Sequence, residues 1–308
     1  ITALSEIAEP EELFYELNNA QATFYNKVIH DYFGEDGQFT GAIYQPYHYE
    51  TGADADADLD EQGNFAFQQQ RNLFEFMRRL LVKRFESSFA AFECSIRSFL
   101  RINKKALAFI QKTDRYILDR KLLNELSEKD ETEILEELER FEAKFDNEDG
   151  ERNRKEEVYK VDKFAMKERF LEDIAADIAL FEAIEKEINE LGLLKEDPKA
   201  DCLIHELRQT LHSKPKAGEP KRKVIIFSEY VDTVRELAPV IEAAFPDRVF
   251  TVAGQFGAMK EKDMLANFDA SIDESKQVDN FDILLASDKI SEGFNLNRAG
   301  LIVNYDIP

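Results

Sequence analysis

The last third of the chain alternates short strand-like segments with helical segments, and this pattern constrains the fold more than any other feature. The expected strands are 223–228, 248–252, 281–286 and 300–305, with helices at 230–245 and 260–268. Strand–helix–strand alternation predicts a parallel sheet joined by right-handed crossovers. The apolar runs VIIF and ILLA are typical of strands covered on both faces of the sheet. The sequence therefore predicts an α/β lobe.

The chain before this lobe has the periodicity of helices. Apolar residues recur three and four positions apart, which is the spacing of an amphipathic helix. The expected helical segments are 11–33, 68–126 (as one long helix or two stacked ones), 127–192 and 200–211. Several glycines interrupt 34–64, so we expect a loop there. We expect 147–152, which contains Gly150, to form the turn between two antiparallel helices.

These patterns divide the chain into three parts. We predict a linker helix and loop at 1–64, an α-helical domain with an acidic helical hairpin at 65–212, and an α/β lobe at 213–308. The 308 residues include 25 Phe and are 44% hydrophobic, which is enough apolar material to form real cores. The predicted fold class is therefore α/β, with a large α-helical domain beside the parallel sheet.

The overall charge and the cysteines argue against several kinds of protein. A formal net charge of −23 repels phosphate over the surface as a whole, so any nucleic-acid site must be local. Cys94 and Cys202 form no CxxC pair, which argues against a zinc module and fits a reducing, cytoplasmic compartment. Because Cys94 lies on an apolar helical segment, we expect it to be a small core residue. No apolar run approaches the ~18 residues of a membrane span, so no membrane association is expected.

One basic stretch stands out inside this acidic chain. Residues 71–121 carry thirteen Lys and Arg against five Asp and Glu, whereas 122–200 carry thirteen against twenty-six. Four basic residues form one stripe at helical spacing: Arg97, Arg101, Lys104 and Lys105. The stripe either follows a nucleic-acid backbone or faces the acidic hairpin. We favour the second interpretation, because the acidic partner lies in the same chain.

Four segments of the predicted lobe follow a recognisable pattern. They are KVIIFSEY at 223–230, FTVAG at 250–254, MLANFDAS at 264–271 and FDILLASDKISEGFNLNRAGLIVNYDIP at 281–308. Together they resemble the second motor lobe of Swi/Snf-type superfamily 2 helicases. The first segment is similar to helicase motif IV, and the last is similar to motif V with the strand that follows it. The last segment is the most specific signal, because it matches over twenty-eight ordered positions.

The resemblance extends to the first half of the chain. RRLLVKRFESSFAAF at 78–92 is similar to a helix that follows the first motor lobe in bacterial members of this group. LNNAQATFY at 17–25 is similar to the link that leaves that first lobe. The resemblance thus implies an inter-lobe linker at 1–64 and a partial RecA-like lobe at 213–308. It does not cover the helical hairpin.

The resemblance implies an ATP-dependent helicase or translocase that moves on nucleic acid, duplex DNA above all, together with its own N-terminal motor lobe. ATP and Mg²⁺ would be bound mainly by that first lobe. The chain contains no phosphate loop with GK[ST] and no acidic Walker B pair. It also stops at Pro308, just before the position of the arginine-rich motif VI. We therefore expect this chain to have no catalytic residue of its own, to hydrolyse no ATP and to bind no cofactor tightly.

Motifs IV and V supply the candidate nucleic-acid contacts. The resemblance implies phosphate contacts at Ser228, Gly254 and Ser287, and a role for Asp288 in organising motif V. Ser287 can offer its hydroxyl and its backbone N–H to a phosphate. These positions follow predicted parallel strands, and ligands of open α/β sheets bind at the C-terminal ends of such strands.

Motif V also supplies the candidate residues of the cleft between the lobes. The resemblance places Glu292, Gly293 and Asn295 there, near the nucleotide. A glycine at 293 permits a backbone turn that a side chain would forbid. Serine, aspartate, glycine and asparagine are also common turn formers, so a purely structural role is the alternative for the polar positions of this motif.

The rival function is a non-catalytic scaffold, in which the helical hairpin binds a protein partner and the α/β lobe is a degenerate remnant.

Asp54, Asp56 and Asp58 resemble the start of an EF-hand loop. Because Leu59 and Phe65 stand where that loop needs Gly and Glu, we expect no metal site there.

Overall fold

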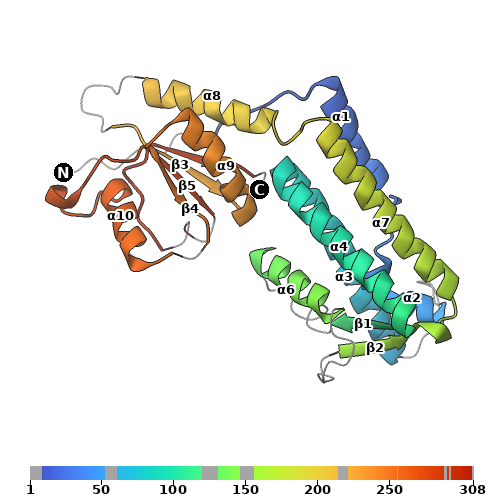
Figure 1. The fold of residues 1–308 in the computed structure, drawn as a ribbon. Helices are drawn as coiled ribbons and strands as arrows, with labels where there is room; N and C mark the ends of the chain where they lie inside the picture. The colour runs from blue at the N-terminus through green and yellow to red at the C-terminus, as the bar shows by residue number, and fades with distance from the viewer. Residues whose placement is uncertain are drawn as a thin grey trace.

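A computed structural model of the protein describes most of the chain. The described residues are 9–52, 61–119, 131–145, 156–213, 221–254, 256–287, 290 and 293–306. Figure 1 shows an α/β lobe beside a longer helical domain, with α8 reaching from the lobe towards the helical domain. No helix in these ranges is long and apolar enough to cross a membrane.

The lobe is built on a four-stranded parallel sheet, as the sequence predicts. Its strands are β3 (Val224–Ser228), β4 (Val249–Val252), β5 (Ile283–Ser287) and β6 (Leu301–Asn304), in the order β4-β5-β3-β6. All three neighbouring pairs are parallel, which confirms the predicted sheet. The central pair runs in register from Val224 and Ile283 to Ser228 and Ser287, so β3 and β5 end together.

Helices cover both faces of this sheet. They are α8 (Pro198–His212), α9 (Val231–Ala244) and α10 (Ala258–Phe268), with a 3-10 turn at Glu274–Lys276. Helices α8 and α9 pack on the face that carries Ile226 and Leu285, while α10 packs on the face that carries Ile225 and Leu284. Alternate residues of one strand thus enter two different cores, which explains why the centres of β3 and β5 contain no polar residue.

The helical domain has its own core, rich in phenylalanine. Its helices are α1 (Asn19–Asn26), α2 (Pro46–Thr51), α3 (Glu61–Ser87), α4 (Phe89–Thr113), α6 (Glu131–Lys144) and α7 (Lys167–Glu190). Shorter turns are the π-helical η1 (Lys27–Tyr32) and the 3-10 turns η2 (Ala42–Tyr44) and η3 (Val161–Lys163). Helix α4 is central, because α3, α6 and α7 all pack against it. Phe99 of α4, for example, contacts the rings of Phe39 and Phe181.

The N-terminal helix is shorter than predicted. The sequence predicted a helix over 11–33, whereas α1 begins at Asn19 and continues into the π-helical η1. The start is set by a capping box between Asn18 and Gln21, in which each side chain accepts the backbone N–H of the other residue at 2.9 and 3.0 Å. These bonds satisfy N–H groups that have no partner inside the helix and fix its first turn.

The predicted loop at 34–64 is wrong in part, because it contains η2, α2 and the start of α3. The residues Ala42, Ile43, Tyr44 and Tyr49 are buried in the core of the helical domain. Elements of three and six residues are too short for helical periodicity to appear in the sequence. Tertiary packing stabilises them instead.

The described part of the predicted helical stretch 68–126 ends at Asp119 and consists of two helices followed by a strand. Ser88 separates α3 from α4, since its hydroxyl caps α4 by accepting the N–H of Ala91 at 3.0 Å. Helix α4 ends at Thr113, where Asp114 adopts a left-handed backbone with φ 52°. The strand β1 (Arg115–Asp119) follows and pairs antiparallel with β2 (Glu156–Lys160). No sequence pattern predicted this ribbon.

The sequence predicted an acidic hairpin of two antiparallel helices joined by a turn, and the structure differs from it. Helices α6 and α7 both pack on α4, and β2 and η3 lie between them along the chain. The predicted turn at 147–152 lies outside the described residues. The predicted helix at 200–211 is present as α8, and its Leu203 and Leu207 are buried in the core of the lobe, although the sequence placed this helix with the helical domain.

Candidate functional site

The C-terminal ends of the strands meet at one edge of the sheet. β3 ends at Ser228 and β5 ends at Ser287, and these two residues pair in register. β4 pairs with β5 up to Val252, so Gly254 follows at the same edge. Asp306 comes just after the end of β6. We call Ser228, Gly254, Ser287 and Asp306 the strand-end edge, and it is the position at which parallel sheets bind ligands.

Ser228 is an internal anchor of this edge. Only 1% of its surface is exposed. Its Oγ donates a hydrogen bond to Asp306 Oδ2 over 2.8 Å, and the N–H of Glu229 donates to the same oxygen. One carboxylate therefore joins the end of β3 to the end of β6. In this conformation the Ser228 hydroxyl holds the edge together and does not face a phosphate.

Two features of the strand-end edge have no partner among the described residues. They are the hydroxyl of Ser287 and the space beside Gly254. Ser287 is 1% exposed, and its Oγ has no hydrogen-bond partner among the described residues. A buried hydroxyl without a partner carries a desolvation cost. Gly254 has a φ of 83°, and a Cβ at this position would meet no atom within 4 Å. The positive φ favours glycine, and the open space leaves room for another backbone to approach.

The cleft residues predicted from motif V are described only in part. Asp288 and Glu292 lie outside the described residues. Gly293 and Asn295 are exposed on the segment that runs from β5 to β6. Gly293 has a φ of 94°, so the prediction that this position needs a glycine turn is confirmed. Contact of these residues with a nucleotide or a second lobe stays a prediction.

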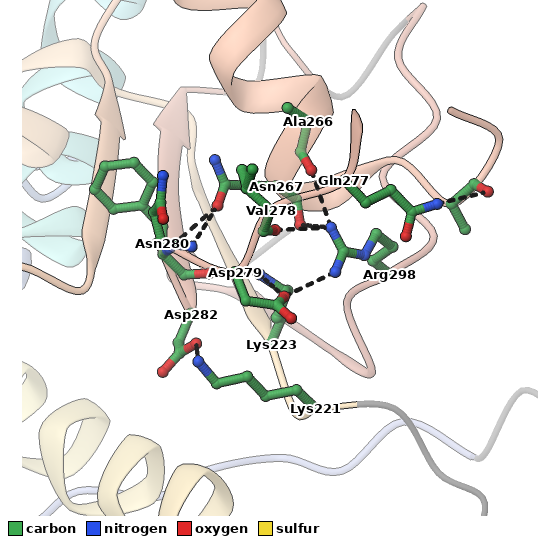
Figure 2. Close-up of polar contacts among 12 residues, drawn as sticks. Lys221, Lys223, Ala266, Asn267, Gln277, Val278, Asp279, Asn280, Asp282 and Arg298 are labelled. Atoms are coloured by element: carbon green, nitrogen blue, oxygen red, sulfur yellow. Dashed lines mark hydrogen bonds and ion pairs between the residues drawn. The ribbon is translucent and has the colours of Figure 1, made fainter. Parts of the chain in front are cut away.

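Arg298 fastens the far end of the motif V segment (Figure 2). Its Nη1 donates to the carbonyl oxygens of Ala266, Asn267 and Val278 at 2.9 to 3.0 Å. Its Nη2 donates to Asp279 Oδ1 at 2.7 Å. These bonds hold the segment against the C-terminal end of α10, at the edge of the sheet opposite the strand-end edge. The planar, five-donor guanidinium group suits this set of acceptors.

Lys223 lies in the same cluster, at the start of β3 (Figure 2). Its side chain is buried, and Nζ donates to the Phe281 carbonyl at 2.6 Å and lies 3.0 Å from Asp279 Oδ1. Burial lowers the pKa of Lys223, while the hydrogen bond to Asp279 favours its charged form. Lys221 pairs with Asp282 at 2.7 Å nearby. Paired charges thus stabilise this end of the sheet.

The basic stripe on α4 forms ion pairs with α6 and α7. The pairs are Arg97 with Glu185, Arg101 with Glu142, Lys104 with Glu182 and Lys105 with Glu142, at 2.5 to 3.4 Å. The prediction that the stripe faces the acidic part of the same chain is therefore confirmed. The basic side chains remain partly exposed, so each pair stabilises the fold by at most about 1 kcal/mol. Contact between the stripe and nucleic acid stays a prediction.

Three residues near the site were not predicted from the sequence. Asp306 organises the strand-end edge, and its place in the NYDIP pattern is the sequence signal that could have identified it. Lys199 places its Nζ 4.3 Å from the ring centroid of Tyr305. Arg298 anchors the motif V segment. Both cations contact parts of the chain far away in sequence, and no local pattern reveals such contacts.

The described ranges contain no group of three or more His, Cys, Asp or Glu side chains that is arranged to hold a metal ion. The acidic residues Asp54, Asp56 and Asp58 lie outside those ranges. Cys94 is exposed, so its predicted place in a core is wrong. It lies three residues before Arg97 on the solvent-facing side of α4, away from the phenylalanine core.

The comparison with known proteins identifies the α/β lobe. Residues 199–308 match the family described as helicase conserved C-terminal domain. The matched part contains the whole parallel sheet and every residue of the strand-end edge. This part of the chain is therefore similar to the RecA-like C-terminal lobe of superfamily 2 helicases. No curated protein and no solved structure matches the chain.

Proposed function

We propose that this chain supplies the second motor lobe of an ATP-dependent translocase of the Swi/Snf type, which moves on duplex DNA. The observation that carries the proposal is the strand-end edge, inside the part that matches the helicase C-terminal domain. Ser228, Gly254 and Ser287 lie together there, where parallel sheets bind ligands. A DNA backbone at this edge would meet the Ser287 hydroxyl and the backbone at Gly254, while Ser228 and Asp306 hold the edge together. Such neutral contacts position a duplex without reading its sequence.

The proposal assigns ATP and Mg²⁺ mainly to a first motor lobe, which would be the partner of this one. The acidic Walker B pair that would hold Mg²⁺ is absent from the sequence. The sequence also lacks the GK[ST] loop that binds phosphates. Hydrolysis would depend on closure of the two lobes around the nucleotide. Alone, this chain would hydrolyse no ATP.

The proposal implies weak binding of duplex DNA by the chain alone. A net charge of −23 opposes the approach of a polyanion, and neutral contacts release few counterions. The acidic side chains of α6 and α7 already pair with the basic stripe. The expected dissociation constant at physiological salt is no tighter than ~10⁻⁴ to 10⁻⁶ M, the range of non-specific complexes.

Fluorescence anisotropy of a labelled duplex, titrated with the chain at several salt concentrations, tests this function. We expect weak binding at low salt that is lost as the salt concentration rises, with a shallow slope because neutral contacts release few counterions. The rival scaffold function predicts no binding even at low salt. That outcome, or tight binding that does not depend on salt, would count against the proposed function.

A further inference from the structure

The break between α3 and α4 lies against the α/β lobe. Helix α3 ends at Ser87, Ser88 caps α4, and both serines are buried. Their hydroxyls lie 2.8 and 3.4 Å from the hydroxyl of Thr233, in the first turn of α9. We call residues 84–88 the α3–α4 joint. In Figure 1 the end of α4 nearest the lobe faces α9, in keeping with this contact.

Arg84 is the most deeply buried charge of the joint, with 1% of its side chain exposed. Inside the helical domain, its Nε and Nη2 donate to the Ala91 carbonyl at 3.3 and 3.2 Å. Across to the lobe, Nη2 donates to Asp232 Oδ2 at 2.6 Å, and the guanidinium carbon lies 5.2 Å from the ring centroid of Tyr230. A buried arginine of this kind is stable only when its donors are satisfied, so it holds both parts of the chain in one arrangement.

A second cation contacts the same joint. Lys199 of α8 donates from Nζ to the backbone carbonyls of Glu86 and Ser87 at 2.9 and 2.8 Å. The same Nζ lies 4.3 Å from the ring centroid of Tyr305. Burial lowers the pKa of Lys199, while Asp306 is the first of the groups that favour its charged form.

These contacts reach two neighbouring strand ends of the strand-end edge, those of β3 and β6. Tyr230 is two residues beyond Ser228, at the end of β3, and Tyr305 is adjacent to Asp306, at the end of β6. The bond between Ser228 and Asp306 closes the edge between them. The joint therefore contacts the segment after β3 directly, and it is linked to the segment after β6 through Lys199.

We propose that Arg84 is a positioning residue for the nucleic-acid edge of the lobe, through which the α3–α4 joint fixes the conformation of residues 228–233. Arg84 touches no ligand in this scheme. It holds Tyr230 and Asp232, and so sets where the end of β3 lies. The part that concerns nucleic acid rests on the proposed function, whereas the mechanical coupling can be measured without any ligand.

Three variants of the full 308-residue chain isolate this role. Arg84→Lys keeps a positive charge but loses the planar fork that reaches two acceptors. Asp232→Asn removes the charge on the lobe side and leaves the bonds of Arg84 inside the helical domain in place. Arg78→Lys is the matched control, because Arg78 lies on the same helix and contacts Glu75 and Phe33 within the helical domain.

Hydrogen–deuterium exchange at residues 228–233 measures the coupling directly. Arg84→Lys and Asp232→Asn should each speed exchange there by about tenfold or more, as expected when a buried charge-assisted bond is lost. Arg78→Lys should leave exchange in that segment unchanged. If Arg84→Lys unfolds the chain, Asp232→Asn alone decides the matter. Unchanged exchange in Asp232→Asn, or an equal rise in Arg78→Lys, would overturn the proposal.

Anisotropy of a labelled duplex at low salt connects the coupling to binding. Arg84→Lys and Asp232→Asn should weaken binding about fivefold or more relative to Arg78→Lys, since a loosened edge must be ordered by the ligand. Faster exchange with unchanged affinity would overturn the positioning role while leaving the coupling in place. If the unsubstituted chain binds no duplex, the proposed function fails, and the exchange experiment still decides whether Arg84 positions residues 228–233.

Discussion

The Ser228 hydroxyl and the Asp306 carboxylate lie 2.8 Å apart and join the ends of β3 and β6, two strands far apart in sequence. Because the Glu229 N–H also donates to this carboxylate, a single acidic side chain organises the end of β3. The two motifs that contain these residues, motif IV and the strand after motif V, are therefore one structural unit.

Substitution of Ser228 by alanine tests this unit. We expect Ser228→Ala to lower the free energy of unfolding by about 1–3 kcal/mol, because it removes a buried bond to a charged group. Ser275→Ala is the matched control, since Ser275 also donates to an aspartate, Asp273, but on the exposed surface. The control should change stability by less than about 0.5 kcal/mol. Urea denaturation of both variants measures the difference, and equal losses would contradict the account.

Arg298 is expected to be irreplaceable by lysine. Arg298→Lys keeps the charge but reaches fewer of the three carbonyls and the carboxylate of Asp279 that Arg298 holds (Figure 2), so we expect a loss of about 1–3 kcal/mol. In the control Arg169→Lys, the arginine that pairs with Asp173 is exposed, so we expect the melting temperature to stay nearly unchanged. Thermal melts of both variants compare them. A neutral Arg298→Lys would show that the anchor does not depend on the guanidinium fork.

Asp177 should make the stability of the helical domain depend on pH. This carboxylate is fully buried and accepts the N–H and the hydroxyl of Thr40 at 2.8 and 2.9 Å. Burial raises the pKa of Asp177 to about 7, and the hydrogen bonds from Thr40 oppose that shift. Since the folded pKa lies above the unfolded one, the native state binds the proton more tightly. The stabilisation is complete below about pH 4 and is lost as the pH rises through 7.

Comparison with Asp177→Asn isolates this effect from the other acids. The stability of the unsubstituted chain, relative to the variant, should fall between pH 5.5 and pH 7 by on the order of 1.4 kcal/mol per pH unit. Urea denaturation at several pH values in this window measures it. A difference that stays constant with pH would contradict the prediction.

The basic stripe is expected to stabilise the fold without contacting DNA. Arg97→Glu combined with Arg101→Glu replaces attractions to Glu185 and Glu142 by repulsions. We expect the melting temperature to fall by roughly a few degrees, while the affinity for duplex DNA stays the same. A thermal melt beside an anisotropy titration separates the two roles. Lost binding with an unchanged melt would assign the stripe to nucleic acid instead.

The α/β lobe was predictable because its signals are local. The apolar runs around Ile226 and Leu285 identify strands, the helical spacing between them identifies crossovers, and these rules determine a parallel sheet. The ribbon of β1 and β2 was missed, because five-residue strands inside a helical region carry too short a pattern. The short helix α2 was missed for the same reason.

For the candidate site, the sequence predicts which residues belong to it but not the contacts that their side chains make. The positions of Ser228 and Ser287 follow from the ends of their strands, and the structure pairs the two residues. The bond from Arg84 to Asp232 joins residues 148 positions apart, and no periodicity or motif indicates such a contact. Nor does any sequence pattern indicate that the Ser228 hydroxyl donates a hydrogen bond to Asp306.

A pair of charge reversals on one crossover tests the central claim most directly. Lys260 is exposed in the first turn of α10, the helix that follows Gly254 along the chain, and its Nζ lies 5.8 Å from the ring centroid of Phe250 in β4. Lys276 is exposed beyond the other end of that helix. The account predicts that Lys260→Glu weakens binding of a labelled duplex and lowers the slope of log affinity against log salt by about 1, while Lys276→Glu changes neither. Equal effects of the two variants, or binding that neither variant changes, would contradict a nucleic-acid site at the strand-end edge.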